Sequence, residues 1–455
     1  MTARIRLTGL SHWLLAAGLV VAGGAAAQGG EPHDLLTITN DALQYSAAYE
    51  AARAQYVAAR ELIPQAQGKL LPQLTAQGKY DHFWEDISGT FFNVPVDRSA
   101  HYNQATYGAQ LTQALYRPEL LLGKASAQAR LEQAGQLLRA QQDALLFSAA
   151  QAYFGVIATQ EAAALARTEV ETLAQHLRQT RERVDAGLSI EAELKTVEAS
   201  YQLARANLTR ADDAVLDAQI TLEALTGQHY SRLQALPETV QLVAPQPSDV
   251  AQWLARAKIE NPLIRGKQAA LEMAITQRKI AGKAQLPKVD LIGNAYWLDS
   301  SGGATGDRDE NQQRIGVMAT VPLYAGGQIE ATKRQTFAQQ QQAESELQDT
   351  VRQVERDVRI AHRKATSGLQ QVSALQQAVI AAQSAESAAR AAFDAGTLTS
   401  ADMLEAVRKR FEAERSYSQA RYAALLSGLQ LKVLAGNLLV ADVAQVNQLL
   451  SGGAR

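Results

Sequence analysis

The sequence contains an internal duplication, and this repeat restricts the fold more than any other feature of the chain. The segment from Tyr107 to Gly227 recurs between Ile315 and Gly436 with almost constant spacing. Three short motifs occur in the same order in both halves. Leu111-Thr-Gln-Ala-Leu-Tyr116 corresponds to Ala319-Thr-Val-Pro-Leu-Tyr324, Val184-Asp-Ala-Gly187 to Phe393-Asp-Ala-Gly396, and Leu225-Thr-Gly227 to Leu434-Ala-Gly436. The chain is therefore expected to fold as two similar halves.

Each half is expected to run helix, strand, loop, strand, long helix, tight turn and helix. An Ala-rich helical stretch ends at a proline in both halves, in Leu70-Leu-Pro-Gln-Leu74 and in Gln285-Leu-Pro-Lys-Val289, because proline cannot continue a helix. Residues 28–240 are predicted to form the first repeat, 241–440 the second and 441–455 a C-terminal tail. A linker that contains Pro237, Pro245 and Pro247 joins the two repeats.

The stretches that follow these prolines alternate between apolar and other residues, which predicts strands. One face in the second half carries Val289, Leu291, Gly293, Ala295 and Trp297, and another carries Ile315, Val317, Ala319 and Val321. The first half alternates more weakly, from Leu74 to Trp84 and from Tyr102 to Tyr116. The polar segments Glu85 to Ala100 and Asp299 to Asn311 are expected to be loops. Half-buried hairpins of a soluble domain would show the same alternation.

Long helices with coiled-coil seams are predicted for most of the remaining chain. Apolar and small residues recur in steps of four and three, which is the spacing of such a seam. They are Ala152, Val156, Thr159, Ala163, Ala166, Val170, Leu173, Leu177, Thr180 and Val184 in the first half, and Leu347, Val351, Val354, Val358, Ala361 and Ala365 in the second. A helix from Ile329 to Ala395 would be about 100 Å long. Gly187 and Gly396 are expected to end these helices, since glycine readily adopts the left-handed conformation.

The N-terminus has the layout of a secretory signal peptide. Arg4 and Arg6 precede an apolar run from Leu7 to Ala22, and Ala25-Ala-Ala27 follows it. Residues 1–27 are therefore expected to be removed on export. The alternative, a retained membrane anchor, fits less well because the apolar run is short.

Composition excludes several kinds of chemistry. The chain has no cysteine, so disulfides, thiolate metal sites and lipid attachment at the mature N-terminus are ruled out. A net charge of −2 gives no basic field for nucleic acid. The seven histidines are scattered, and no catalytic motif is found, so the sequence predicts no metal, no cofactor and no enzyme.

Four strands per chain would leave a problem of closure in a membrane. A sheet embedded in lipid must leave no open edge, and four strands are too few to close a barrel. Other copies must then complete the wall, and three chains would supply twelve strands. The paired long helices would continue the same cylinder away from the membrane.

Several motifs together resemble the TolC family of outer-membrane efflux proteins over essentially the whole mature chain. They are Asp185-Ala-Gly-Leu-Ser-Ile-Glu-Ala-Glu193, Asp394-Ala-Gly-Thr-Leu-Thr-Ser-Ala-Asp402, Val321-Pro-Leu-Tyr-Ala-Gly-Gly327 and Leu429-Gln-Leu-Lys-Val-Leu-Ala-Gly436. The resemblance implies a mainly α fold with a small β part. Its long antiparallel coiled-coil helices would form a periplasmic α-barrel, and its four transmembrane strands would complete a 12-stranded barrel in a homotrimer.

The resemblance also implies a function and partners. The chain would be the outer-membrane channel of a tripartite efflux or type I secretion system in a Gram-negative cell, surrounded by outer-membrane lipid. It would dock onto a periplasmic adaptor, or membrane fusion protein, fed by an inner-membrane transporter of the RND, ABC or MFS type. A soluble periplasmic adaptor or scaffold would explain the signal peptide and the long helices, but not the duplicated aromatic-bearing hairpins.

Residues of a periplasmic gate are carried over from the family. Asp402 and Glu405, three residues apart on one predicted helix, correspond to its inward-facing acidic residues, although any such pair can simply be a solvated helix face. Three copies would form two stacked carboxylate rings that attract cations and raise carboxylate pKa values as the pore narrows. Glu193 occupies the equivalent place after the first turn. Phe393 and Leu398 depart from the family, which has a tyrosine and a basic residue there.

The two glycine turns are the predicted contacts for the adaptor. Both are expected at the same end of the molecule, and their glycines also serve ordinary turn geometry. The residues concerned are Gly187, Leu188 and Ser189 in the first turn, and Gly396, Thr397 and Leu398 in the second.

Overall fold

The computed structural model describes residues 32–450 apart from 238, 239, 241, 304 and 305. Spatial contacts divide the chain after Pro32, and each helix and strand given below belongs to the unit His33–Arg455. The predicted signal peptide, residues 1–27, lies outside the described residues. The last five residues of the predicted tail also lie outside them.

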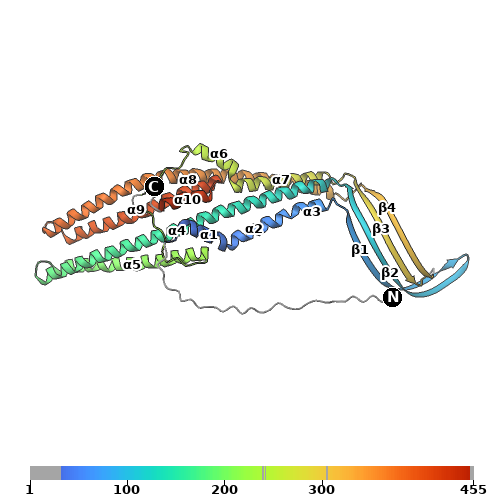
Figure 1. The fold of residues 1–455 in the computed structure, drawn as a ribbon, viewed down its shortest axis with the longest axis horizontal. Helices are drawn as coiled ribbons and strands as arrows, with labels where there is room; N and C mark the ends of the chain where they lie inside the picture. Colours follow the sequence, from blue (N-terminus) through green and yellow to red (C-terminus); the bar gives the residue numbers. More distant parts are fainter. Residues whose placement is uncertain (1–31, 238–239, 241, 304–305, 451–455) are drawn as a thin grey trace, which may run out of the picture. The chain divides into compact units, whose positions relative to one another are not determined.

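The described chain is mainly helical, with one small antiparallel sheet, as the sequence predicts (Figure 1). The first half contains α1 (Leu35–Tyr45), α2 (Ala47–Arg60), α3 (Leu62–Gly68), β1 (Gln73–Phe91), β2 (Val94–Tyr116), α4 (Pro118–Asp185) and α5 (Glu191–Thr226). The second half contains α6 (Val250–Glu260), α7 (Pro262–Gly282), β3 (Lys288–Ser301), β4 (Asp307–Thr320), α8 (Gln328–Asp394), α9 (Ser400–Ala435) and then α10 (Val440–Leu450). Helices α4 and α8 have 68 and 67 residues, and α5 and α9 have 36 each, so the duplication is visible in the structure.

Two long helical hairpins, α4 with α5 and α8 with α9, lie side by side in Figure 1. At ~1.5 Å per residue, α8 is about 100 Å long, the predicted length. All the predicted seam residues are buried or half-buried, which confirms the coiled-coil pattern. Each hairpin turns at the predicted glycine, Gly187 with φ +72° and Gly396 with φ +76°. The backbone then closes onto the helix end, where the Leu188 N–H donates to the Arg183 carbonyl at 2.8 Å.

The four strands form a sheet in the order β1-β2-β3-β4, with every neighbouring pair antiparallel. Strands β2 and β3 come from different halves, so their pairing joins the two repeats. Strands β1 and β4 are the edges of this sheet in the single chain.

The register gives the sheet one apolar face and one polar face. Cross-strand partners share a face, as Tyr107 and Trp297 do, or Gly293 and Ile315. The apolar face carries Leu74, Tyr80, Trp84, Tyr107, Trp297, Ile315 and Val317. These side chains are 45–74% exposed in the single chain. The opposite face carries Thr75, Gln77, Lys79, Gln110, Asn294, Gln312 and Arg314.

The predicted loops are wrong over most of their length. Residues 85–91 and 94–100 are paired strand, and the first hairpin turns at Phe92 and Asn93, both with positive φ. Residues 299–301 and 307–311 are also strand. The segments were taken for loops because they are polar and lack a clear alternation, yet backbone pairing continues through them without needing an apolar side chain.

The largest core cluster lies where α4 crosses the short helices α1 and α10 and the far ends of α5 and α9. Tyr153 and Phe154 of α4 are fully buried at its centre. The Tyr153 hydroxyl donates to the Gln234 carbonyl at 2.7 Å, which satisfies its polar atom. Within the described part of the chain, no helix is both long enough and apolar enough to cross a bilayer.

A buried ion pair ties the sheet to the helices. Arg117, immediately before α4, donates through Nε and Nη2 to the two carboxylate oxygens of Asp290 in β3, at 2.7 and 2.6 Å. The Asp290 side chain is only 4% exposed. This bidentate ion pair fixes the start of α4 against the third strand, β3. It therefore links the two halves of the chain at the base of the sheet.

Replacing Arg117 by glutamine should destabilise the protein. The substitution leaves the Asp290 carboxylate buried without its cation, which we expect to cost about 2 kcal/mol, less than for a fully buried pair because Arg117 is partly exposed. Thermal unfolding in detergent, followed by circular dichroism, measures the effect. Lys79→Gln is the matched control because it breaks the exposed Lys79–Asp81 pair, and it should shift the midpoint little. Equal shifts for the two variants would contradict the role given to Arg117.

Candidate functional site

The two glycine turns lie at the same end of the helical hairpins in Figure 1. In the first turn, Gly187 and Leu188 are exposed, with Leu188 72% exposed, while Ser189 is half-buried. In the second, Gly396 and Thr397 are exposed while Leu398 is half-buried. The predicted tip residues are thus accessible, apart from Ser189 and Leu398, which are partly covered.

An apolar cluster lies just behind the turns, which we call the tip cluster. It draws on all four long helices and contains Leu173, Val197, Ala204, Phe393, Met403, Leu404, Val407 and Phe411. Leu398 packs against its rim. Phe393 and Leu398, the two departures from the family pattern, are therefore brought together in apolar packing that connects the first hairpin with the second.

Asp402 lies in the first turn of α9, which Thr399 caps. The Asp402 N–H donates to the Thr399 hydroxyl oxygen at 3.2 Å, and that hydroxyl donates to Asp402 Oδ2 at 2.6 Å. The carboxylate also lies close to the positive end of the helix dipole. Asp402 is exposed, so its charge is available to solvent beyond this local role.

Glu405 lies one turn further along α9 and is held by Arg408. The guanidinium donates through Nε and Nη2 to the two carboxylate oxygens at 2.9 and 2.7 Å, and Lys409 Nζ lies 3.7 Å from Oε1. The hydrogen bond from Arg408 keeps the pKa of Glu405 below its ordinary value. Sequence reasoning missed Arg408, although its spacing of three residues from Glu405 is a recognisable signal for an ion pair on a helix.

Glu193 lies at the start of α5, and its contacts are local. Its carboxylate accepts a hydrogen bond from the Ser189 hydroxyl, and its N–H donates to the Ile190 carbonyl at 3.1 Å. Both bonds stay within the first hairpin. Asp402 and Glu405 therefore share one helix, whereas Glu193 lies on the neighbouring hairpin.

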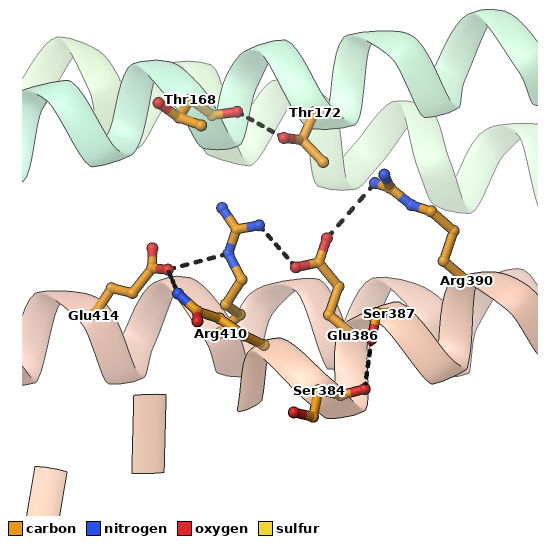
Figure 2. Close-up of polar contacts among 9 residues, drawn as sticks. Thr168, Thr172, Ser384, Glu386, Ser387, Arg390, Arg410 and Glu414 are labelled. Atoms are coloured by element: carbon orange, nitrogen blue, oxygen red, sulfur yellow. Dashed lines mark hydrogen bonds and ion pairs between the residues drawn. The ribbon is translucent and has the colours of Figure 1, made fainter. Parts of the chain in front are cut away.

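A layer of charged side chains lies further along α8 and α9 from the turns. Figure 2 shows Arg410 between two carboxylates: its Nη1 lies 2.8 Å from Glu386 Oε2, and its Nε lies 3.4 Å from Glu414 Oε1. Arg390 approaches the other Glu386 oxygen at 3.5 Å. The Glu386 side chain is 8% exposed, so this buried network fixes the register of α8 on α9.

A further ion pair joins this layer to the first hairpin. Arg415 of α9 lies 3.5 Å from the buried Glu169 of α4, and burial raises the pKa of that carboxyl. Sequence reasoning missed the layer because its contacts run between helices that lie far apart in the chain. Within the described residues, no group of three or more His, Cys, Asp or Glu side chains could hold a metal ion.

Comparison with known proteins finds outer membrane proteins that match most of the chain. The family model "Outer membrane efflux protein" matches residues 38–228 and 253–437. The outer membrane protein TolC of Vibrio cholerae serotype O1 is 28% identical over 91% of this chain and 93% of its own. The alkaline protease secretion protein AprF of Pseudomonas aeruginosa is 24% identical over 89% of this chain and 85% of its own.

Solved structures agree on the fold. The Campylobacter jejuni CmeC outer membrane channel superposes with a TM-score of 0.79 at 15% identity, over 91% of this chain and 89% of that one. With its duplicated hairpins, its sheet and both matched segments, the chain belongs to the outer membrane efflux protein family. It is an outer-membrane exit channel of the kind used in efflux and type I secretion, with a large periplasmic part. The resemblance to the TolC family is thereby confirmed.

Removing Arg408 should change both the titration and the cation affinity of the tip. In Arg408→Gln the pKa of Glu405 rises toward its ordinary value, so this carboxylate takes up its proton at a higher pH than in the wild type. At pH 7 it stays ionised, and losing one neighbouring positive charge should strengthen block by a divalent cation roughly tenfold, as Coulomb's law gives for a doubly charged ion at about 6 Å in water. Single-channel recording with Mg²⁺ on the periplasmic side, from pH 7 to 4, measures both effects.

The control for this variant is Arg363→Gln, which removes an exposed arginine from α8 far from the turns. It should leave block and its pH dependence at wild-type values. Unchanged block in Arg408→Gln would show that the Arg408–Glu405 pair does not set the charge felt by the permeating ion.

Proposed function

We propose that three copies of this chain assemble into one duct, with twelve strands in the outer membrane and a helical tunnel in the periplasm. The observation that carries this proposal is the sheet with two edges and one apolar face. Unpaired edge strands cannot face lipid, and pairing β1 of one copy with β4 of the next would remove both edges. The apolar face would then contact lipid and the polar face would line the channel.

The duct would act as a passive conduit, not as an enzyme, within a three-part export system. Its two repeats, residues 28–240 and 241–440, would each contribute one strand pair and one helical hairpin, followed by the tail 441–455. The turns Gly187-Leu188-Ser189 and Gly396-Thr397-Leu398 would contact a periplasmic adaptor, or membrane fusion protein. That adaptor would connect the duct to an inner-membrane transporter of the RND, ABC or MFS type. The name of AprF, a protease secretion protein, favours a role of the type I secretion kind.

The periplasmic gate would combine a charged ring with an apolar seal. Asp402 and Glu405, repeated three times, would form two stacked carboxylate rings, and Arg408 would offset part of the charge of the Glu405 ring. Phe393, in the tip cluster, and Leu398, at its rim, would hold the hairpins together by apolar packing. Glu193, bound to Ser189, would stabilise the first turn beside them.

Assembly is tested by membrane fractionation and electrophoresis without heating. We expect the protein in the outer membrane, extractable only with detergent, and migrating as a trimer that heating converts to a monomer. Ile315→Lys places a charge on the apolar face and should lower the yield of trimer, since lysine facing lipid costs about 2–4 kcal/mol at mid-membrane. Gln312→Lys, on the polar face of the same strand, is the matched control and should assemble normally. A soluble monomer would instead identify a periplasmic scaffold.

The gate residues are tested by removing their charges. Asp402→Ala combined with Glu405→Ala should weaken cation block of single-channel current severalfold, because both predicted rings are lost. The control variant, Glu191→Ala with Glu198→Ala, removes the same number of charges from α5 and should leave the block intact. If both double variants keep wild-type block, Asp402 and Glu405 do not form the cation site of the pore.

A further inference from the structure

One imidazole connects the first hairpin with both helices of the second. His176 of α4 is 4% exposed, and its Nε2 lies 2.9 Å from the hydroxyl oxygen of Ser400. Ser400 is the first residue of α9 and is itself buried. The ring of His176 also meets the ring of Phe393 in α8 edge-on, with centroids 5.2 Å apart.

The surroundings of His176 are apolar and sparsely charged. Leu173 and Leu177 flank it on α4 and belong to the tip cluster or its rim. The charged groups that face it are Arg183 on α4, Glu193 on α5, and Arg390 and Asp394 on α8, while α9 contributes only the Ser400 hydroxyl. Arg183 and Arg390 disfavour a charged imidazole and Glu193 and Asp394 favour one, and burial outweighs each of these contributions.

We propose that His176 is the latch that holds the second hairpin against the first near the tip, and that its protonation releases this contact. The proposal rests on the proposed function, in which the hairpin tips form the periplasmic gate. It assigns the polar contact between the hairpins to a neutral, buried imidazole, which lies beside the apolar packing of Phe393 and Leu398.

The direction of the effect follows from burial. Burial lowers the pKa of His176 below its ordinary value, with smaller and opposing contributions from the charged groups named above. In the loosened state the imidazole is hydrated and its pKa returns toward the ordinary value of about 6.5. The loosened state therefore binds more protons, and the packed state loses stability as the pH falls below about 6.5.

Distance measurement by spin labels tests the latch without depending on channel activity. Because the chain has no cysteine, Leu188→Cys and Thr397→Cys place one label in each exposed turn. Co-expression with an excess of unlabelled chains keeps the measured pair within one chain. Between pH 7.5 and pH 5, we expect the ratio of loosened to packed conformers, read from the distance between the turns, to rise severalfold. The limit set by a loosened-state pKa of about 6.5 is about thirtyfold.

Three variants separate the latch from general acid effects. His176→Gln keeps a hydrogen-bonding group beside Ser400 but cannot be protonated, so the rise on acidification should disappear. Ser400→Ala leaves the imidazole without its partner and should raise the loosened population already at pH 7.5. The control, His362→Gln, changes a histidine on α8 that contacts the Ser248 carbonyl, about 45 Å along the helix from Phe393, and should behave as wild type.

Two results would overturn the proposal: no change in the wild-type distances between pH 7.5 and 5, or an unchanged rise in His176→Gln. Single-channel recording of the same variants then reports on the gate separately. If the distances respond to pH but the channel current does not, the latch is retained, and the hairpin tips do not form the gate. A channel that never forms would contradict the proposed function alone.

Discussion

The edges of the sheet are the constraint on which the rest of this structure depends. Strands β1 and β4 have no partner on one side in the single chain, while one face of the sheet is apolar and exposed. A soluble domain would cover such a sheet with helices, but α4 and α8 run away from it instead of across it (Figure 1). The sheet therefore suits an environment in which its apolar face contacts lipid and its edge strands hydrogen-bond to neighbouring strands.

The duplication explains how one chain can serve both the membrane and the periplasm. Each half supplies two strands followed by a long helical hairpin, and β2 pairs with β3 to make one sheet from the two halves. The bidentate Arg117–Asp290 ion pair then fixes α4 of the first half against β3 of the second. The two halves are thus joined at the base of the sheet by an ion pair, and near the glycine turns by the apolar tip cluster.

Sequence reasoning succeeded where a pattern repeats locally. The glycine turns and the helical seams depend on residues close in the chain, and both are found as predicted. The loop predictions failed because Glu85 to Ala100 is polar, and strand pairing there depends on the facing strand and not on side-chain alternation. Arg408 could have been found from its spacing to Glu405, whereas the Glu386–Arg410 pair and the His176–Ser400 contact require knowledge of which helices are neighbours.

A buried neutral group and an ion pair would hold two hairpins together in different ways. An ion pair between hairpins holds over a wide pH range, because both partners stay charged, but burying it carries a large desolvation cost. An apolar seal made of Phe393 and Leu398 avoids this cost, yet by itself it fixes no particular alignment of the hairpins. In the proposed latch, the hydrogen bond between the His176 imidazole and the Ser400 hydroxyl would supply the missing direction, and burial favours the neutral imidazole. A tip held in this way would lose, on acidification, a contact that an ion pair would keep.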